Sequence, residues 1–103
     1  MGWADPHIER LRRGQPVQFR PRGHSMRGRI ESGQRVTVTP SPEEPRVGDA
    51  VLCRVKGRCF LHLVKAVGGH GKARRYLIGN NRGGINGWVP RGAIYGLCTG
   101  VED

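Results

Sequence analysis

Ser25 is the residue of this sequence whose surroundings best suit a nucleophile. It lies in the segment Gly-His-Ser-Met, directly after a predicted strand. Met26 and Ile30 have the spacing of one helical face, so a short helical turn is predicted to follow. Such a turn exposes the Ser25 hydroxyl beside free backbone N–H groups that can hold an oxyanion. On spacing alone the pattern is weak, because a serine before a helical turn is far more often a cap.

A serine hydroxyl is a poor nucleophile until an adjacent base takes its proton. The apolar run 59–67 contains two residues that can act as this base, His62 and Lys65. Burial in an apolar strand keeps such a base neutral near pH 7, because water no longer stabilises its charged form. The two positions are an odd number of residues apart, so a regular strand points only one of them toward Ser25. A bulge changes that facing, so both remain candidates.

The other histidines are expected to be bystanders. His24 adjoins the serine, but neighbouring residues of an extended chain point apart, so it should face substrate or solvent. His7 falls on a predicted exposed helix and His70 in a glycine-rich turn. For His62 itself, the structural alternative is a core histidine whose ring is satisfied by a backbone carbonyl.

The order of segments along residues 17–101 resembles that of the LexA-like and signal-peptidase-like superfamily of serine peptidases. The segments that carry the resemblance are 23–26 (GHSM), 30–36 (IESGQRV), 47–52 (VGDAVL), 61–65 (LHLVK), 76–81 (YLIGNN) and 94–96 (IYG). The resemblance implies a mainly antiparallel, coiled β fold and a serine nucleophile in a Ser-Met pair. The base in that superfamily is a lysine, or a histidine in the endoplasmic-reticulum and archaeal signal peptidases.

By this resemblance Ser25 takes the nucleophile position and His62 the base position, with Lys65 as the alternative base. The Leu-His-Leu-Val context is similar to that of the histidine-type signal peptidases. The resemblance adds two further pairs to the site, the backbone N–H groups of Ser25 and Met26 for the oxyanion and the supporting amides of Asn80 and Asn81. The implied reaction needs no cofactor and no metal ion.

Two departures from the family pattern favour an alternative. The Ser-Met-x-Pro of most relatives ends here in Gly28, and Asn80 replaces the aspartate of the Gly-Asp-Asn found in many signal peptidases. An amide can hydrogen-bond a base but cannot stabilise its protonated form as a charge does. The alternative is a catalytically inactive relative, a basic β module that binds protein or nucleic acid.

The expected substrate is a protein or peptide cleaved in trans. Self-cleavage of the LexA kind needs an Ala-Gly or Cys-Gly bond before the nucleophile, and no glycine bond ahead of Ser25 has a small residue on its acyl side. No membrane anchor or helix-turn-helix precedes the predicted β core. We therefore expect neither a free-standing signal peptidase nor a complete repressor, and the sequence does not indicate the oligomeric state.

The charge of the chain supports the binding alternative. Eighteen basic residues against eight acidic ones give a formal net charge of +10, which favours nucleic acid or other anionic partners. Four arginines around the serine segment form a candidate anion-binding surface, Arg20, Arg22, Arg27 and Arg29. Scattered arginines also make an ordinary solvated exterior. Trp88 and Tyr95 could stack on bases, but in a chain with so few aromatic residues we expect both in the core.

Composition predicts one mainly β domain over residues 1–103. Seventeen glycines and seven prolines are too many for a helical bundle. Short alternating or apolar runs predict mostly sequential antiparallel strands, and residues 50–55 and 59–67 should form a central hairpin. We expect a small coiled sheet or partly open barrel over residues 17–101. The proline-rich segment 40–45 should project into solvent.

One short helix is predicted within residues 3–14. Asp5 should cap its start, with Pro6 at the first helical position, and Gly14 should end it. Trp3, Ile8 and Leu11 are expected to dock the helix on the β body.

No membrane span is expected, because the longest apolar run is about half of the ~20 residues a spanning helix needs. The N-terminus also lacks an apolar signal segment. These features predict a cytoplasmic protein. Its three cysteines form no C-x-x-C pair and are expected to be reduced.

Thiol titration of the denatured, unreduced protein should therefore find three free thiols. A two-residue turn at Lys56-Gly57 pairs Cys53 with Phe60 and places it on the opposite face from Cys59, so no disulfide joins them. Detection of a single thiol would contradict this prediction.

Overall fold

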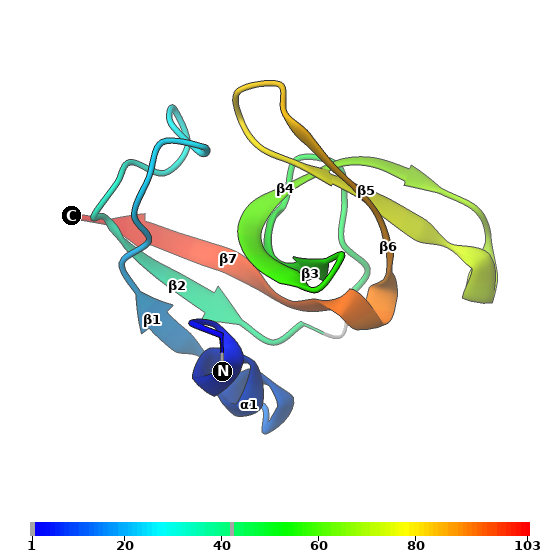
Figure 1. The fold of residues 1–103 in the computed structure, drawn as a ribbon. Helices are drawn as coiled ribbons and strands as arrows, with labels where there is room; N and C mark the ends of the chain where they lie inside the picture. Colours follow the sequence, from blue (N-terminus) through cyan, green and yellow to red (C-terminus); the bar gives the residue numbers. More distant parts are fainter. Residues whose placement is uncertain (1, 42) are drawn as a thin grey trace.

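The computed structural model describes residues 2–41 and 43–103, and these form one antiparallel sheet with a short N-terminal helix (Figure 1). Met1 and Pro42 lie outside the described residues. The elements, in chain order, are α1 (Asp5–Arg12), β1 (Val17–Phe19), β2 (Arg35–Thr39), β3 (Ala50–Val55), β4 (Arg58–Gly68), the 3₁₀ turn η1 (Gly71–Ala73), β5 (Arg75–Gly79), β6 (Ile85–Pro90), the 3₁₀ turn η2 (Arg91–Ala93) and β7 (Ile94–Glu102). The predicted fold class is confirmed, and the sheet does not close into a barrel.

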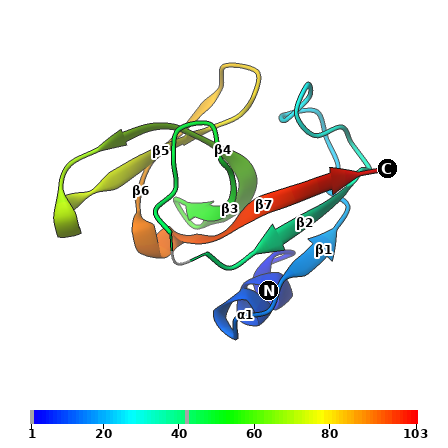
Figure 2. The same ribbon diagram turned by 180° about the vertical axis from the view of Figure 1, so that it is seen from behind.

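The strand order is β1-β2-β7-β3-β4-β5-β6. The last strand thus lies between β2 and β3 and joins the two halves of the sheet. Figures 1 and 2 show β4 curling around β3, while α1 and β1 lie beneath β2. The predicted central hairpin is confirmed, with Val55 opposite Arg58 and Cys53 opposite Phe60. Lys56 and Gly57 form its two-residue turn at φ of 51° and 82°, the positive values that a tight hairpin turn requires.

The coiling of the sheet divides the buried residues into two cores. The first core contains the helix residues Ile8 and Leu11 together with Leu52 of β3. The second core contains Val51 and Cys53, which alternate with Leu52 along the same strand. Because both faces of β3 are covered, the strand is apolar apart from Arg54 instead of alternating with polar residues.

The start of α1 differs from the prediction. Ile8 and Leu11 are buried as expected, but Trp3 is 53% exposed and Ala4 is buried in its place. Ala4 is also the N-cap residue, without a side-chain capping bond. The Asp5 carboxylate instead accepts a hydrogen bond from the backbone N–H of Gly2 and pairs with Arg54. The small Ala4 lets the helix approach the sheet closely, which leaves Trp3 at the edge of the contact.

In the segment 40–45, of which Pro42 lies outside the described residues, Glu43 and Glu44 are exposed as expected, but Ser41 and Glu44 are bonded to the body. Arg91 Nη2 donates to the Ser41 carbonyl oxygen over 2.7 Å. The Glu44 carboxylate accepts from the hydroxyl of the buried Tyr76 over 2.8 Å and pairs with Arg74. A buried tyrosine hydroxyl needs a partner, and the segment supplies it.

The prediction that Trp88 is a core residue is wrong. Trp88 is 54% exposed, while its neighbour Val89 is buried in the second core. Val89 pairs with the buried Tyr76, so alternation along β6 turns Trp88 to the outer face of the sheet. Tyr95 packs, partly buried, against the first core. Among the described residues, no helix has the length and apolar character needed to cross a membrane.

The packing of α1 on the sheet depends on a glycine in β7. A Cβ atom at Gly96 would lie 2.8 Å from the Thr39 carbonyl oxygen, 2.8 Å from Val38 Cγ1 and 3.2 Å from Leu11 Cδ2. Gly96→Ala should lower the free energy of unfolding by about 1–3 kcal/mol through overpacking, measured by chemical denaturation. Gly92→Ala is the matched control, because nothing lies within 4 Å of that Cβ. Equal stability of the two variants would contradict the close contact.

Candidate active site

Ser25 begins a series of tight hydrogen-bonded turns after the extended chain that follows β1. The backbone N–H groups of Arg29 and Ile30 donate to the Met26 carbonyl oxygen over 2.9 Å and 2.8 Å. Met26 and Ile30 are both buried in the first core, whereas Ser25 is exposed. The segment forms consecutive turns and not a regular helix, but the expected placement results: the apolar side chains anchor it and the hydroxyl stays accessible.

Gly28 explains one departure from the Ser-Met-x-Pro pattern. Its φ is 96°, which proline cannot adopt. Its N–H donates to Glu31 Oε2 over 2.7 Å, and a Cβ there would lie 3.1 Å from Asn81 Nδ2. The turn in this chain therefore requires glycine at position 28.

The structure brings Ser25 and His62 together. His62 lies on β4, is 6% exposed, and its Nε2 is 3.1 Å from Ser25 Oγ. The ring of Phe60 stacks on the imidazole with a centroid separation of 4.8 Å. One ring nitrogen of a buried histidine thus reaches an exposed serine hydroxyl.

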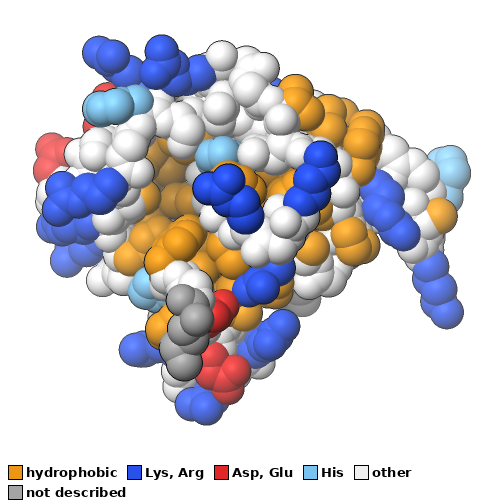
Figure 3. Space-filling model, in the orientation of Figure 1, with side chains coloured by type: hydrophobic (Ala, Val, Ile, Leu, Met, Phe, Trp, Pro, Cys, Tyr) orange, Lys and Arg blue, Asp and Glu red, His pale blue; other side chains and the backbone are white. Residues whose placement is uncertain are grey.

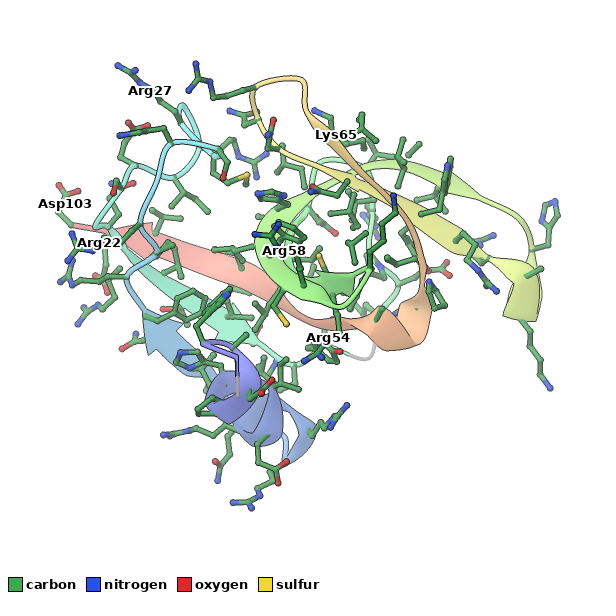
Figure 4. All side chains as sticks on the ribbon, in the orientation of Figure 1. Arg22, Arg27, Arg54, Arg58, Lys65 and Asp103 are labelled. Carbon is green, nitrogen blue, oxygen red and sulfur yellow. The ribbon has the colours of Figure 1, made fainter. Side chains whose placement is uncertain are left out.

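The structure holds Lys65 elsewhere (Figure 4). Its Nζ donates to the Asn80 carbonyl oxygen over 3.0 Å, and its side chain packs beside Gly79. The pairing of β4 with β5 shifts between Val64 and Ala66, so Lys65 sits at an irregularity of the strand. Its ammonium group fixes the loop after β5 and does not hydrogen-bond the serine.

Asn86 completes the group and was missed by the sequence reasoning. Its Oδ1 lies 2.7 Å from His62 Nδ1. On β6, Ile85 pairs with Gly79 and Gly87 with Ile78, so Asn86 is the extra residue of a β-bulge. A bulge changes the direction in which a side chain points. Here it directs the Asn86 amide toward the His62 imidazole. The chain had shown only that three asparagines lie in this glycine-rich stretch.

The Asn86 bond fixes the tautomer of the histidine. With the amide oxygen facing the ring, Nδ1 carries the proton and donates, which leaves the Nε2 lone pair free to accept from the serine hydroxyl. Burial lowers the pKa of His62, and the hydrogen bond to Asn86 offsets part of that effect. The imidazole is therefore neutral at pH 7 and able to accept a proton.

Asn80 and Asn81 contact the serine segment and the loop after β5 and do not hydrogen-bond His62. The N–H of Asn81 donates to the Ser25 carbonyl oxygen over 2.9 Å, and its Nδ2 donates to the Arg27 carbonyl oxygen over 2.8 Å. Asn80 Oδ1 accepts from the N–H groups of Arg82 and Gly84 and so shapes the loop. The loop between β5 and β6 thus holds the serine turn in place.

Two backbone donors beside the serine are free. Within residues 2–41 and 43–103, the N–H groups of Ser25 and Met26 donate to no protein acceptor, while the N–H of Arg27 donates to the His24 carbonyl oxygen. Free N–H groups next to a nucleophile can hold the oxygen of an attacked carbonyl.

A groove of about 530 Å³ opens at the Ser25–His62 pair. Figure 3 shows hydrophobic side chains gathered in this hollow, with lysine and arginine around it. His7, expected on an exposed helix, is half-buried in the wall of the groove and stacks on Phe19 at a centroid separation of 4.7 Å. The lining comprises Trp3, His7, Phe19, Arg20, Pro21, Arg22, Gly23, Ser25, Met26, Ile30, Glu31, Cys59, Phe60, Leu61 and His62.

The four predicted anion-binding arginines do not converge. Arg20 and Arg22 line the groove, and Arg20 Nη1 also donates to the Gly33 carbonyl oxygen. Arg29 Nη1 donates to the Gly48 carbonyl oxygen over 3.0 Å. Arg27 is exposed, and Figure 4 shows it on the serine loop, well apart from Arg22.

No protein-family model, curated protein or solved structure matches the chain. The described residues contain no group of three or more His, Cys, Asp or Glu side chains placed to hold a metal ion. All three cysteines are free.

An NMR titration should give His62 a pKa below 6.5, the ordinary value, with its signals assigned by their loss in His62→Gln. Folded His62 binds a proton less tightly than unfolded His62, so the unfolded state takes up more protons below pH 6.5. Stability should be full above that pH and fall as the pH drops toward the folded pKa. His62→Gln should flatten this dependence.

Asn86→Asp should raise the pKa of His62 relative to the wild type, because a carboxylate stabilises the imidazolium. An unchanged pKa in Asn86→Asp, or a wild-type pKa at or above 6.5, would contradict the assigned hydrogen bond and burial.

Proposed function

We propose that this protein is a serine endopeptidase that uses Ser25 as nucleophile, His62 as general base and Asn86 as the residue that orients the base. The observation that carries the proposal is the pair of contacts made by one imidazole. Its Nε2 is 3.1 Å from Ser25 Oγ, and its Nδ1 is 2.7 Å from Asn86 Oδ1. Nucleophile, base and orienting group in hydrogen-bond reach form the arrangement that serine and cysteine peptidases share.

The reaction follows from this geometry. Ser25 Oγ attacks the carbonyl carbon of the peptide bond while its proton passes to His62 Nε2. The N–H groups of Ser25 and Met26 bind the resulting oxyanion. His62 then gives the proton to the leaving amine, and an acyl-enzyme forms. Water attacks the ester, His62 takes the proton of that water and returns it to Ser25 Oγ, and the acid product is released.

The asparagine suits this role because its oxygen accepts from Nδ1. An asparagine that presented its NH₂ group to the ring would impose the wrong tautomer, with Nε2 protonated and unable to act as base. Asn86 presents Oδ1 and so selects the active tautomer, although it lends no negative charge to the imidazolium. We infer a slower enzyme than one with a carboxylate at this position.

The proposal includes membership of the LexA-like and signal-peptidase-like superfamily, in a compact form with a histidine base. The open groove beside Ser25 supports cleavage of a separate protein or peptide. The three free thiols support a reducing compartment such as the cytoplasm.

A fluorophosphonate should label the native protein at Ser25, as located by peptide mass spectrometry. Ser25→Ala should abolish labelling. His62→Ala should slow it by about 100-fold or more, the usual contribution of a general base. Asn86→Ala should slow it by about tenfold, through loss of the tautomer. Lys65→Ala should retain most of the labelling, because Lys65 Nζ bonds the Asn80 carbonyl oxygen and not the serine.

Absence of labelling at neutral to mildly alkaline pH would overturn the peptidase proposal. The inactive binding module would then be favoured by nucleic-acid affinity that falls steeply with added salt and is unchanged by Ser25→Ala.

A further inference from the structure

The groove continues from the Ser25–His62 pair to a cluster of three aromatic rings contributed by α1, by β1 and by the turn that precedes α1. We call Trp3, His7 and Phe19 the aromatic cluster. Trp3 and Phe19 have ring centroids 5.6 Å apart, and His7 stacks on Phe19. The same hollow is lined by the cluster and by the reacting pair, so one extended chain can contact both.

Within the aromatic cluster, Trp3 is not buried by the docking of the helix. Ala4, Ile8 and Leu11 are buried at 0%, 4% and 3% exposure and make that contact. Trp3 keeps 53% of its surface exposed. An indole left open in a groove offers apolar area and an aromatic face to a side chain that enters it.

Positive charge lies beside the cluster. Arg58 is exposed, with its guanidinium carbon 5.9 Å from the centroid of the Phe60 ring, which itself stacks on His62. Figure 4 shows Arg58 at the start of β4, over the middle of this face. Arg58 and Trp3 also line one smaller hollow of about 280 Å³ that adjoins the groove. An aromatic surface and a cation are therefore offered side by side.

The acidic groups near the groove are already engaged. Glu31, which lines it, accepts from the N–H of Gly28 through Oε2. Asp5, which lines the smaller hollow, pairs with Arg54. Arg20 and Arg22 add positive charge to the groove wall. The charge complementary to this face is negative.

We propose that the peptide substrate carries an aromatic or large aliphatic side chain that binds the aromatic cluster, next to an acidic side chain that pairs with Arg58. The inference rests on the proposed peptidase function and names the substrate that the site selects. Trp3 takes no part in the proposed bond-breaking steps. The aromatic cluster therefore selects the substrate through its binding affinity.

The test uses the full-length Ser25→Ala protein, which can bind a substrate but cannot cleave it. A library of extended peptides is captured on it and identified by mass spectrometry. Enrichment of peptides with an aromatic or large aliphatic residue beside Asp or Glu is expected. Trp3→Ala in the same background should weaken the selected peptides by about tenfold or more, while Trp88→Ala, which removes an equally exposed indole from β6, should not.

Arg58→Glu supplies a second variant whose folding is not at issue, because the residue is exposed at a turn. It should exchange the acidic preference for a basic one and leave the aromatic preference in place. Equal binding by wild type, Trp3→Ala and Trp88→Ala, or an acidic preference that survives Arg58→Glu, would overturn the inference.

Fluorophosphonate labelling separates the two proposals, because this small probe does not extend to the aromatic cluster. In the Ser25 protein, Trp3→Ala should lower kcat/KM for the selected peptide about tenfold, whereas Trp88→Ala should leave both kcat/KM and labelling unchanged. Labelling without an effect of Trp3→Ala on the peptide refutes the subsite alone. Absence of labelling in the wild type refutes the peptidase.

Discussion

Among the described residues, His62 is a buried polar side chain in a core whose other buried side chains are apolar. The orientation of its ring depends on the hydrogen bond to Asn86. A buried imidazole nitrogen without a partner would cost about 1–3 kcal/mol. Asn86 removes that cost for Nδ1, and Ser25 supplies the partner for Nε2. The same two bonds that make the burial tolerable also orient the ring. Stability and the proposed chemistry therefore require the same two hydrogen bonds at this position.

The coiled sheet brings these three residues together from distant parts of the chain. β4 supplies the imidazole, the turns after β1 supply the serine and the bulge of β6 supplies the amide. Gly79 permits this approach, since a Cβ there would lie 2.4 Å from the Gly84 carbonyl oxygen. Without a side chain at the end of β5, the chain can turn back at Gly84 and bring Asn86 of β6 within hydrogen-bond distance of His62 on β4.

The parts of the fold and site that could be predicted are those with a local signal. Alternating and apolar runs indicated the strands, and the spacing of Met26 and Ile30 indicated the buried side of the serine turn. Asn86 had no such signal, because a bulge is set by how β5 and β6 pair and not by the residue that occupies it. The exposure of Trp3 and Trp88 was also missed. Whether a large aromatic residue is covered depends on which neighbours the topology brings to it, and its own hydrophobicity does not decide that.

The segment 80–86, which comprises the loop between β5 and β6 and the start of β6, contacts both halves of the site. At one end Asn81 bonds the carbonyl oxygens of Ser25 and Arg27, and at the other end Asn86 bonds His62. Opening of the whole segment would break the hydrogen bonds to the serine turn and the one to the imidazole together. The fraction of molecules in which both sets of bonds are present then depends on the local unfolding equilibrium of one short segment.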